Sequence, residues 1–314
     1  MKRVFALLLC IAMLLSFAAC GSLKEEEKPV PTPAPTIPSM AAPTEEPTAA
    51  PTEAPTEPAP VQTAPENLTI VDTDQAAFVL AKVETSDHMG MRLHVQCVNK
   101  TDRALTFSWD QVSVCGYMYD PGWFEEISAG KTVSAAIDLD TYELEQMGIH
   151  SVDEITFTLN IFDSENWMEG SIVQDVFTVY PTGLDADSLI LPQREADPSQ
   201  ITVAENEDLR FIIEWVDAEN PEQYAVYVYV ENRSDRNLMY TWDKVSINGV
   251  SVNSFWTLTV AAGKKACSKV IFSRAELADA GITEVSRIDF SLIVTDYDDW
   301  EGENLLEKAV TYQP

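Results

Sequence analysis

The sequence is poor in positive charge. It holds 20 lysine and arginine residues against 51 aspartates and glutamates, which gives a net charge of −31 at pH 7. A surface of that sign repels phosphate backbones and anionic lipid headgroups, so nucleic acid is excluded as a partner. The acidity is typical of a well-solvated extracellular surface, and it does not by itself indicate a catalytic role.

Cysteine and histidine are scarce as well, with five and three residues respectively. Beyond the N-terminal segment only Cys97, Cys115 and Cys267 remain, and their spacing does not resemble that of a metal site. Cys97 is expected to point inward from a strand and Cys115 to lie at a hairpin, which is poor geometry for a disulfide. We therefore expect an exported protein that is stable without disulfides.

The N-terminus carries an apolar run after Lys2 and Arg3 that ends near residue 15. The run is too short for a stop-transfer helix, and with its charged start it predicts a signal peptide over residues 1–19. The small residues Ala18 and Ala19 before Cys20 resemble the lipobox of bacterial lipoproteins. The resemblance implies cleavage before Cys20, attachment of acyl chains such as palmitate, and anchoring at the outer face of the cell membrane. An ordinary secretory signal with an incidental cysteine is the alternative.

Proline is concentrated in residues 20–66, where Pro-Thr pairs recur among glutamates. Proline removes backbone donors and biases the residue before it toward extended conformations. The stretch also offers too little apolar surface to collapse around. We therefore expect a disordered, semi-extended stalk that tethers the folded part of the chain to the lipid anchor.

The remaining chain carries an internal repeat. The stretch 98–110 recurs as 231–243, at a constant offset of 133 residues (231 − 98), and the alignment needs no insertion. The tryptophan pairs Trp109/Trp242, Trp123/Trp256 and Trp167/Trp300 and several turn glycines stay in step, which chance would not produce. One domain copied once is therefore the expected organisation, with repeat 1 over 67–182, a linker over 183–199 and repeat 2 over 200–314.

Short apolar alternations separated by turn signals predict strands in both repeats. Phe107 and Trp109 alternate with polar residues, and the Asn-Gly dipeptide at 248–249 is a strong hairpin signal. One short helix is expected per repeat, and in repeat 2 the spacing of Ser273 and Glu276 fits a capping box. About seven strands per repeat predict an all-β fold of two tandem immunoglobulin-like β-sandwiches.

The patterns shared by both repeats resemble the Ig-like sandwich modules of Gram-positive surface lipoproteins. These patterns are Asn-x-x-Asp-Arg from Asn99 and Asn232, Trp-Asp from Trp109 and Trp242, Ala-Gly-Lys and Gly-Ile. Such modules have no uniform activity, so the resemblance implies a fold and a surface location without implying a reaction.

Histidine-based catalysis is disfavoured by the repeat, because all three histidines lie in repeat 1 and have no histidine counterpart in repeat 2: His88, His94 and His150. A function common to both copies therefore cannot depend on imidazole. An activity specific to repeat 1 stays open. A hydrolase that uses paired carboxylates also stays open, since any chain this acidic offers such pairs.

Acidic loops are the best metal candidate. Asp163 of repeat 1 matches Asp296 of repeat 2, which is followed by Asp298 and Asp299. Calcium takes clustered carboxylate oxygens, although the spacing lacks the glycine and the distal glutamate of an EF-hand loop. We expect no cofactor and a solvated hairpin tip at these loops, with calcium as the alternative.

Aromatic side chains are the best binding candidates, because sugars stack on exposed rings and protein interfaces favour Trp and Tyr. Trp109 and Trp242 continue inward alternations and are expected in the core. The candidates for ligand contact lie near predicted loops or on the polar face of a strand: Trp123, Trp256, Trp167, Trp300, Tyr227 and Tyr229. Tryptophans that merely cap the end of a sandwich are the alternative reading of the loop residues.

The sequence therefore predicts a lipid-anchored extracellular protein that acts as a non-enzymatic binding or adhesion module. Its partner would be a cell-wall glycan or an envelope protein. The alternative is a structural or accessory subunit of an envelope complex, and an extracellular hydrolase is the least favoured of the three.

The lipid anchor gives a direct test. The variant Cys20→Ala should move the protein from the membrane fraction to the soluble fraction, because the acyl chains contribute the membrane affinity. Cell fractionation followed by immunoblotting measures the distribution. Continued membrane association of this variant would contradict lipid anchoring at Cys20.

Overall fold

The computed structural model describes residues 64–86, 90–194, 197–299 and 302–314. The expected signal peptide, Cys20 and the stalk up to residue 63 lie outside these ranges, as do His88 and Trp300. Within the described ranges, no helix is both long enough and apolar enough to cross a membrane.

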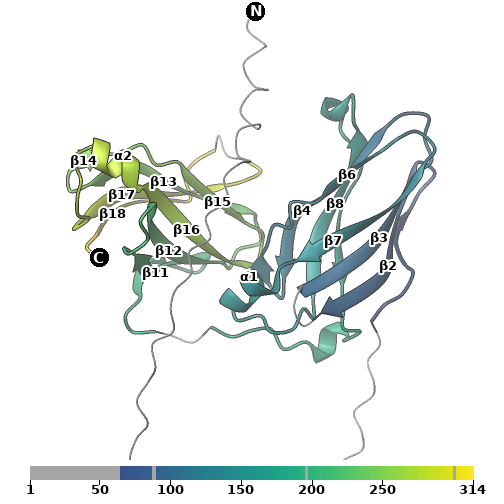
Figure 1. Ribbon diagram of the computed structural model, residues 1–314, viewed down its shortest axis with the longest axis horizontal. Helices are drawn as coiled ribbons and strands as arrows, with labels where there is room; N and C mark the ends of the chain where they lie inside the picture. The colour runs from purple at the N-terminus through teal and green to yellow at the C-terminus, as the bar shows by residue number, and fades with distance from the viewer. Residues whose placement is uncertain (1–63, 87–89, 195–196, 300–301) are drawn as a thin grey trace, which may run out of the picture. The chain divides into compact units, whose positions relative to one another are not determined.

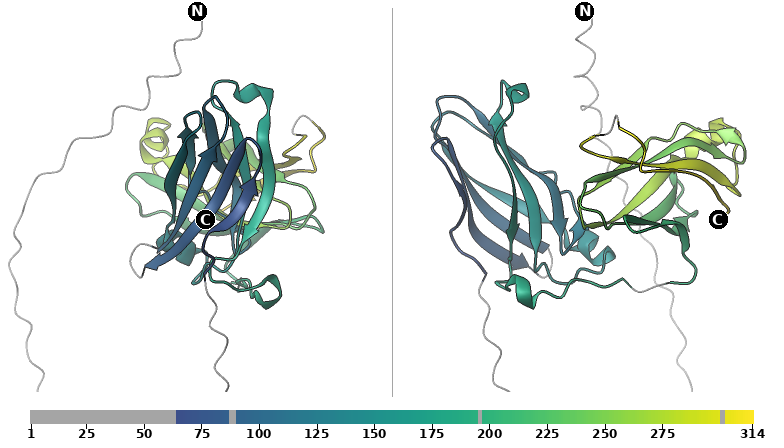
Figure 2. Two further views of the ribbon diagram at one scale, coloured as in Figure 1. Left: turned by 90° about the vertical axis from the view of Figure 1, so that its right-hand side faces the viewer. Right: turned by 180° about the vertical axis from the view of Figure 1, so that it is seen from behind.

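The strands of residues 68–179 form two sheets that share one core (Figure 1). The first sheet has the order β1 (Leu68–Asp72), β2 (Ala76–Ser86), β3 (Gly90–Asn99) and β7 (Thr132–Leu139). The second has the order β6 (Phe124–Ile127), β4 (Leu105–Val114), β8 (Ile155–Asp163) and β9 (Ser171–Val179), with β5 (Tyr117–Met118) also paired to β4. Apart from the added β1, this is the A-B-E against C-F-G arrangement of immunoglobulin-like sandwiches. Figure 2 shows the layers from two further directions.

The strands of residues 201–312 repeat these pairings. One set runs β10 (Ile201–Glu205), β11 (Leu209–Asp217), β12 (Gln223–Asn232) and β16 (Lys265–Ser273). The other holds β13 (Leu238–Ile247), β14 (Val250–Ser251), β15 (Trp256–Val260), β17 (Ile288–Asp296) and β18 (Leu306–Tyr312). Thr69 pairs with Val79 as Thr202 pairs with Ile212, so the register is conserved at the sequence offset.

The β-bulges also recur at equivalent positions of the two repeats. A bulge interrupts β4 between Asp110 and Ser113, and another interrupts β13 between Asp243 and Ser246. A parallel bridge between Lys265 and Tyr117 also pairs β16 with β5, so strands from both repeats belong to one nine-stranded sheet. The all-β sandwich architecture is confirmed, and the pairing alone does not divide the chain into two separate domains.

The stretch 98–110, which recurs as 231–243, contains an asparagine that holds a buried turn. Asn99, at the end of β3, is 1% exposed, and its Nδ2 donates to the carbonyl oxygens of Arg103 and Ile127 at 2.7 and 2.9 Å. Its Oδ1 accepts from the backbone nitrogen and the hydroxyl of Thr101 at 2.9 and 2.7 Å. One amide therefore ties the end of β3 to the start of β4 and the end of β6.

Asn232 makes the same contacts in repeat 2. Its Nδ2 donates to the carbonyl oxygens of Arg236 and Val260 at 2.7 and 2.8 Å, and its Oδ1 accepts from Ser234. A buried amide with all its hydrogen bonds made is stabilising, whereas one left unsatisfied is costly. The shared Asn-x-x-Asp-Arg pattern therefore records a folding constraint.

The shared tryptophans fill the core, as predicted for Trp109 and Trp242. Trp109 stacks on Phe157 with ring centroids 3.8 Å apart, and Trp242 stacks on Phe290 at 3.6 Å. Both tryptophans are at most 5% exposed. Burial of such large rings contributes apolar area that stabilises the fold.

A short helix follows the last strand of the first sheet in each repeat. Asp140 caps α1 (Thr141–Gln146) by accepting from the backbone nitrogen of Tyr142, at 2.8 Å. Ser273 stands at the N-cap of α2 (Arg274–Asp279), but its side chain makes no capping hydrogen bond. The predicted helix is confirmed. The predicted capping box is wrong, because the side chain of Ser273 makes no hydrogen bond with the first turn of α2.

The buried amide predicts a stability difference. Replacement of Asn99 by alanine should lower the free energy of unfolding by about 2 to 4 kcal/mol, because it leaves buried carbonyl and amide groups unsatisfied. Urea unfolding followed by circular dichroism measures the change. Replacement of the partly exposed Asn160 by alanine is the matched control and should change stability by about 0.5 kcal/mol or less. Equal effects of the two substitutions would show that the Asn99 contacts contribute little.

Candidate functional site

Two of the predicted binding tryptophans pack on aromatic rings of the core. Trp256 is 7% exposed and meets Trp242 edge-on at 6.1 Å, and it also packs on Phe211. Trp123 is half-buried and packs in the same way on Trp109 at 6.0 Å. The expectation that Trp256 presents a surface for ligand is wrong, because its ring belongs to a buried aromatic cluster. Trp123 packs against the equivalent cluster and stays partly accessible, so ligand contact at Trp123 stays a prediction.

Tyr229 is also buried. It faces outward from β12, as its alternation predicts, yet it is 0% exposed. Its ring packs against Tyr117, with centroids 6.3 Å apart, and the guanidinium of Arg194 lies 4.1 Å from the ring centroid. Its hydroxyl donates to Glu231 at 2.9 Å. Burial raises the pKa of Tyr229 above its usual range, so the phenol stays neutral. Tyr229 therefore offers no open surface for stacking.

Tyr227 lies in a different environment on the same strand. Its ring stacks on Trp215 of β11 with centroids 3.8 Å apart and planes 9° from parallel. Trp215 is 52% exposed although it packs on Tyr227 on one side. The two residues are direct cross-strand partners, and Lys269 of β16 pairs with Tyr227 on the other side. We call Trp215 and Tyr227 the aromatic step.

The aromatic step lies at a part of the sheet that the edge strand β10 does not cover. The first paired residue of β10 is Ile201, which meets Ile213, so β10 does not extend alongside Trp215. Ile271 of β16, two residues from Lys269 along the same face, is 44% exposed. An indole with one face on Tyr227 and the rest in solvent is suited to contact with an apolar or mixed ligand surface.

Trp167 is the predicted loop tryptophan that is exposed, at 65%. It begins a short 3-10 helix (Trp167–Glu169) in the connection between β8 and β9. Trp300, its counterpart in repeat 2, lies outside the described residues.

The acidic loops use their carboxylates to build turns. Asp163 is 5% exposed and accepts from the backbone nitrogens of Glu165 and Asn166, and Arg103 lies 2.9 Å from its second oxygen. The hydrogen bond from the Asn166 side chain, together with those backbone amides, lowers the pKa of Asp163. Its oxygens are therefore already engaged by protein donors.

The corresponding loop of repeat 2 is arranged in the same way. Asp296 accepts from the backbone nitrogen of Asp298 at 3.0 Å, and Asp298 accepts from Asn237 at 3.3 Å. Over the described part of the chain, no three His, Cys, Asp or Glu side chains are grouped so that they could hold a metal ion. Calcium at Asp163, Asp296, Asp298 or Asp299 stays a prediction of the sequence.

In the described part of the chain the cysteines form no disulfide. Cys97, Cys115 and Cys267 are all unpaired thiols. Burial raises the pKa of Cys97 and of Cys267 to about 12, so both thiols stay protonated at neutral pH. His94 lies 2.9 Å from Glu84 on the outer face of the first sheet, where the hydrogen bond from Lys82 lowers the pKa of Glu84 to about 2.

A second exposed surface covers the outer face of β6, β4, β8 and β9. Four residues stand in register across these strands: Phe124 pairs with Ser108, Ser108 with Asn160, and Asn160 with Gln174. We call these four residues the amide row. Asp110 and Thr158 form the next pair along β4 and β8.

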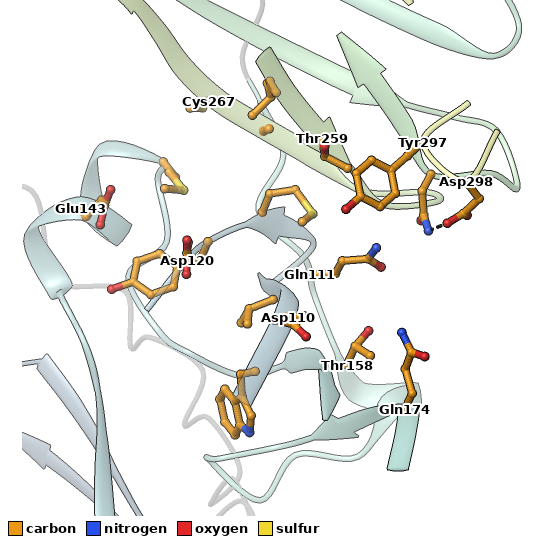
Figure 3. A pocket seen from close by; sticks show the side chains of 18 residues that line it. Asp110, Gln111, Asp120, Glu143, Thr158, Gln174, Thr259, Cys267, Tyr297 and Asp298 are labelled. Carbon is orange, nitrogen blue, oxygen red and sulfur yellow. Dashed lines mark hydrogen bonds between the residues drawn. The ribbon is translucent and has the colours of Figure 1, made fainter. Parts of the chain in front are cut away.

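A hollow of about 890 Å³ adjoins this face (Figure 3). Asp110, Gln111, Thr158 and Gln174 line one part of it, and residues of repeat 2 that include Tyr297 and Asp298 line another. Figure 3 shows Asp110, Thr158 and Gln174 on neighbouring strands, with their polar ends toward the hollow. Binding sites for small molecules are commonly concave and carry a few polar groups that converge on the ligand.

Sequence reasoning missed Trp215 and Phe124. Both occupy positions that the repeats do not share, since their counterparts are Lys82 and Thr257. A search for residues conserved between the copies therefore passes over them. The sequence does contain a signal for both residues. Each is a large apolar side chain at a strand position where the other repeat carries a polar residue.

Comparisons with known proteins do not identify the chain. No family model matches it, and no curated protein matches it. Among solved structures it is similar to a Porphyromonas gingivalis W83 protein of unknown function, with 10% identity over 80% of this chain and 97% of that one, at a TM-score of 0.21.

It is also similar to an exo-chitosanase of Amycolatopsis orientalis (13% identity, 74% of this chain, TM-score 0.22) and to Bacteroides uniformis beta-glucuronidase 2 (11%, 77%, 0.22). The chain spans only 26% of the length of each of these two enzymes. At such TM-scores these likenesses carry no argument about the fold or the function of this chain.

Proposed function

We propose that the protein is a lipid-anchored binding protein of the outer face of a bacterial cell membrane. Cys20 would carry the lipid, and the proline-rich residues 20–66 would hold the folded part away from the bilayer. The lipobox-like sequence and the composition of the stalk support this location. In this proposal residues 67–182 and 200–314 form two tandem sandwich modules.

The aromatic step is the observation that carries the binding role. Trp and Tyr dominate the energetics of recognition, and a ring that is already held by a stack on its neighbour can serve as an anchor for a ligand. The Trp215 side chain is 52% exposed and is held by its stack on Tyr227, so little side-chain entropy is lost on binding. The step is a preorganised contact surface for a glycan of the envelope.

The two repeats would not bind the same ligand in the same way. At the positions of Trp215 and Tyr227, repeat 1 carries Lys82 and His94. The core positions agree between the copies and these outward positions differ. Duplication here supplies two scaffolds with different surfaces, which does not support avidity from two equal sites.

An accessory subunit of an envelope complex is the second candidate. Ile271 is 44% exposed on the face that carries the aromatic step. An apolar residue beside exposed aromatic rings favours a protein partner, because protein interfaces bury such mixed aromatic and aliphatic surfaces. A glycan makes less use of an exposed isoleucine.

The test uses the whole chain purified from membranes in detergent. Binding to immobilised cell-wall glycans and to mixed envelope proteins is measured for the unaltered protein and for Trp215→Ala. Loss of an aromatic anchor should weaken binding at least tenfold, since such anchors contribute about 2 kcal/mol or more. Phe255→Ala removes an exposed aromatic ring outside the aromatic step and is the matched control.

Three results distinguish the candidates. Retention of a glycan that Trp215→Ala abolishes supports the binding module. Retention of one envelope protein that Trp215→Ala abolishes favours the accessory subunit. Binding that Trp215→Ala leaves unchanged would contradict the role given to the aromatic step.

A further inference from the structure

The amide row lies on the solvent face of the sheet. It crosses the four strands β6, β4, β8 and β9 in one line, and Phe124 at its end is 70% exposed. With strands about 4.8 Å apart, three steps make the row about 14 Å long. Ser108, Asn160 and Gln174 supply a hydroxyl and two amides beside the ring. The row therefore joins one apolar platform to neutral polar groups over the length of an extended ligand.

The polar groups around the row hold one another in place. Asn160 Nδ2 donates to Asp110 Oδ2 at 3.2 Å, and the hydroxyl of Ser171 donates to Asn160 Oδ1 at 2.6 Å. The hydroxyl of Ser108 reaches the same Asp110 oxygen at 3.5 Å. The amide and the carboxylate are thus oriented before any ligand arrives, which reduces the entropy lost on binding.

We propose that this face binds a neutral oligosaccharide. The apolar C–H face of a sugar ring would stack on Phe124, as apolar surfaces do on exposed aromatic rings. Its hydroxyl groups both donate and accept, so they match the carboxylate of Asp110 and the amides of Asn160 and Gln174. The site lies on other strands than the aromatic step, and it goes beyond the function proposed above.

Charge selects the class of sugar. Asp110 belongs to the face itself, and Glu126 pairs with Thr106 at the neighbouring position of β6 and β4. The strands β4, β6, β8 and β9 contain no lysine or arginine. An anionic glycan would meet uncompensated like charge, so uronates and phosphorylated or sulfated polymers are disfavoured.

Repeat 2 provides an internal comparison. The row equivalent to Phe124, Ser108, Asn160 and Gln174 is Thr257, Thr241, Ile293 and Glu307. The backbone register is the same, while the ring and both amides are replaced. Sugar binding on this face is therefore expected from repeat 1 and not from repeat 2.

The test measures binding of the whole chain to neutral oligosaccharides by titration calorimetry. The probes are soluble fragments of β-glucan, xylan, mannan and chitin, and polygalacturonate serves as the anionic comparison. At least one neutral probe should bind. Phe124→Ala and Asn160→Ala should each weaken that binding at least tenfold, and polygalacturonate should bind more weakly than the neutral probe.

Thr257→Ala, at the position equivalent to Phe124, is the matched control and should leave the affinity unchanged. Both altered residues of the row are at least partly exposed, and urea midpoints equal to that of the unaltered protein verify that the variants fold. Failure of every neutral probe to bind would overturn the proposal, as would preferred binding of polygalacturonate or binding that survives both substitutions. A neutral probe lost in Trp215→Ala but kept in Phe124→Ala would overturn this site while supporting the aromatic step.

Discussion

The fold of both repeats depends on one buried side-chain amide. Asn99 lies where the chain leaves the first sheet and enters the second, and its hydrogen bonds join the ends of three strands at that crossing. A backbone that changes sheets leaves carbonyl and amide groups without ladder partners, and here a side chain satisfies them. Asn232 does the same, so the constraint was kept when the sequence was copied.

This constraint explains why the most recognisable stretch of the sequence is not a functional site. The residues identical in the two copies include Asn99, Trp109 and Asp163, and each is buried or engaged in a turn. Identity between the repeats at these three positions therefore reports what the fold requires. The exposed residues that can meet a ligand, such as Trp215 and Phe124, stand where the copies differ.

Much of the fold was predictable from local patterns. Alternation placed Trp109 and Trp242 inward, and the Asn-Gly hairpin forms with Asn248 and Gly249 both at positive φ. The predicted binding surfaces were less accurate, because burial depends on segments distant in sequence. Trp256 is covered by Trp242 and Phe211 from other strands, and Tyr117 and Arg194 of the linker pack on Tyr229. Local alternation contains no information on either contact.

The identical register of the two copies has a consequence for how the chain folds. A strand of one repeat fits the backbone place of its counterpart in the other, which invites exchange of strands between tandem copies. The divergent outward pairs oppose that exchange. If β11 paired with β3, Trp215 would meet His94 in place of Tyr227 and lose its 3.8 Å stack. The surface differences that give each repeat its own exposed chemistry thus also favour the observed strand pairing over the exchanged one.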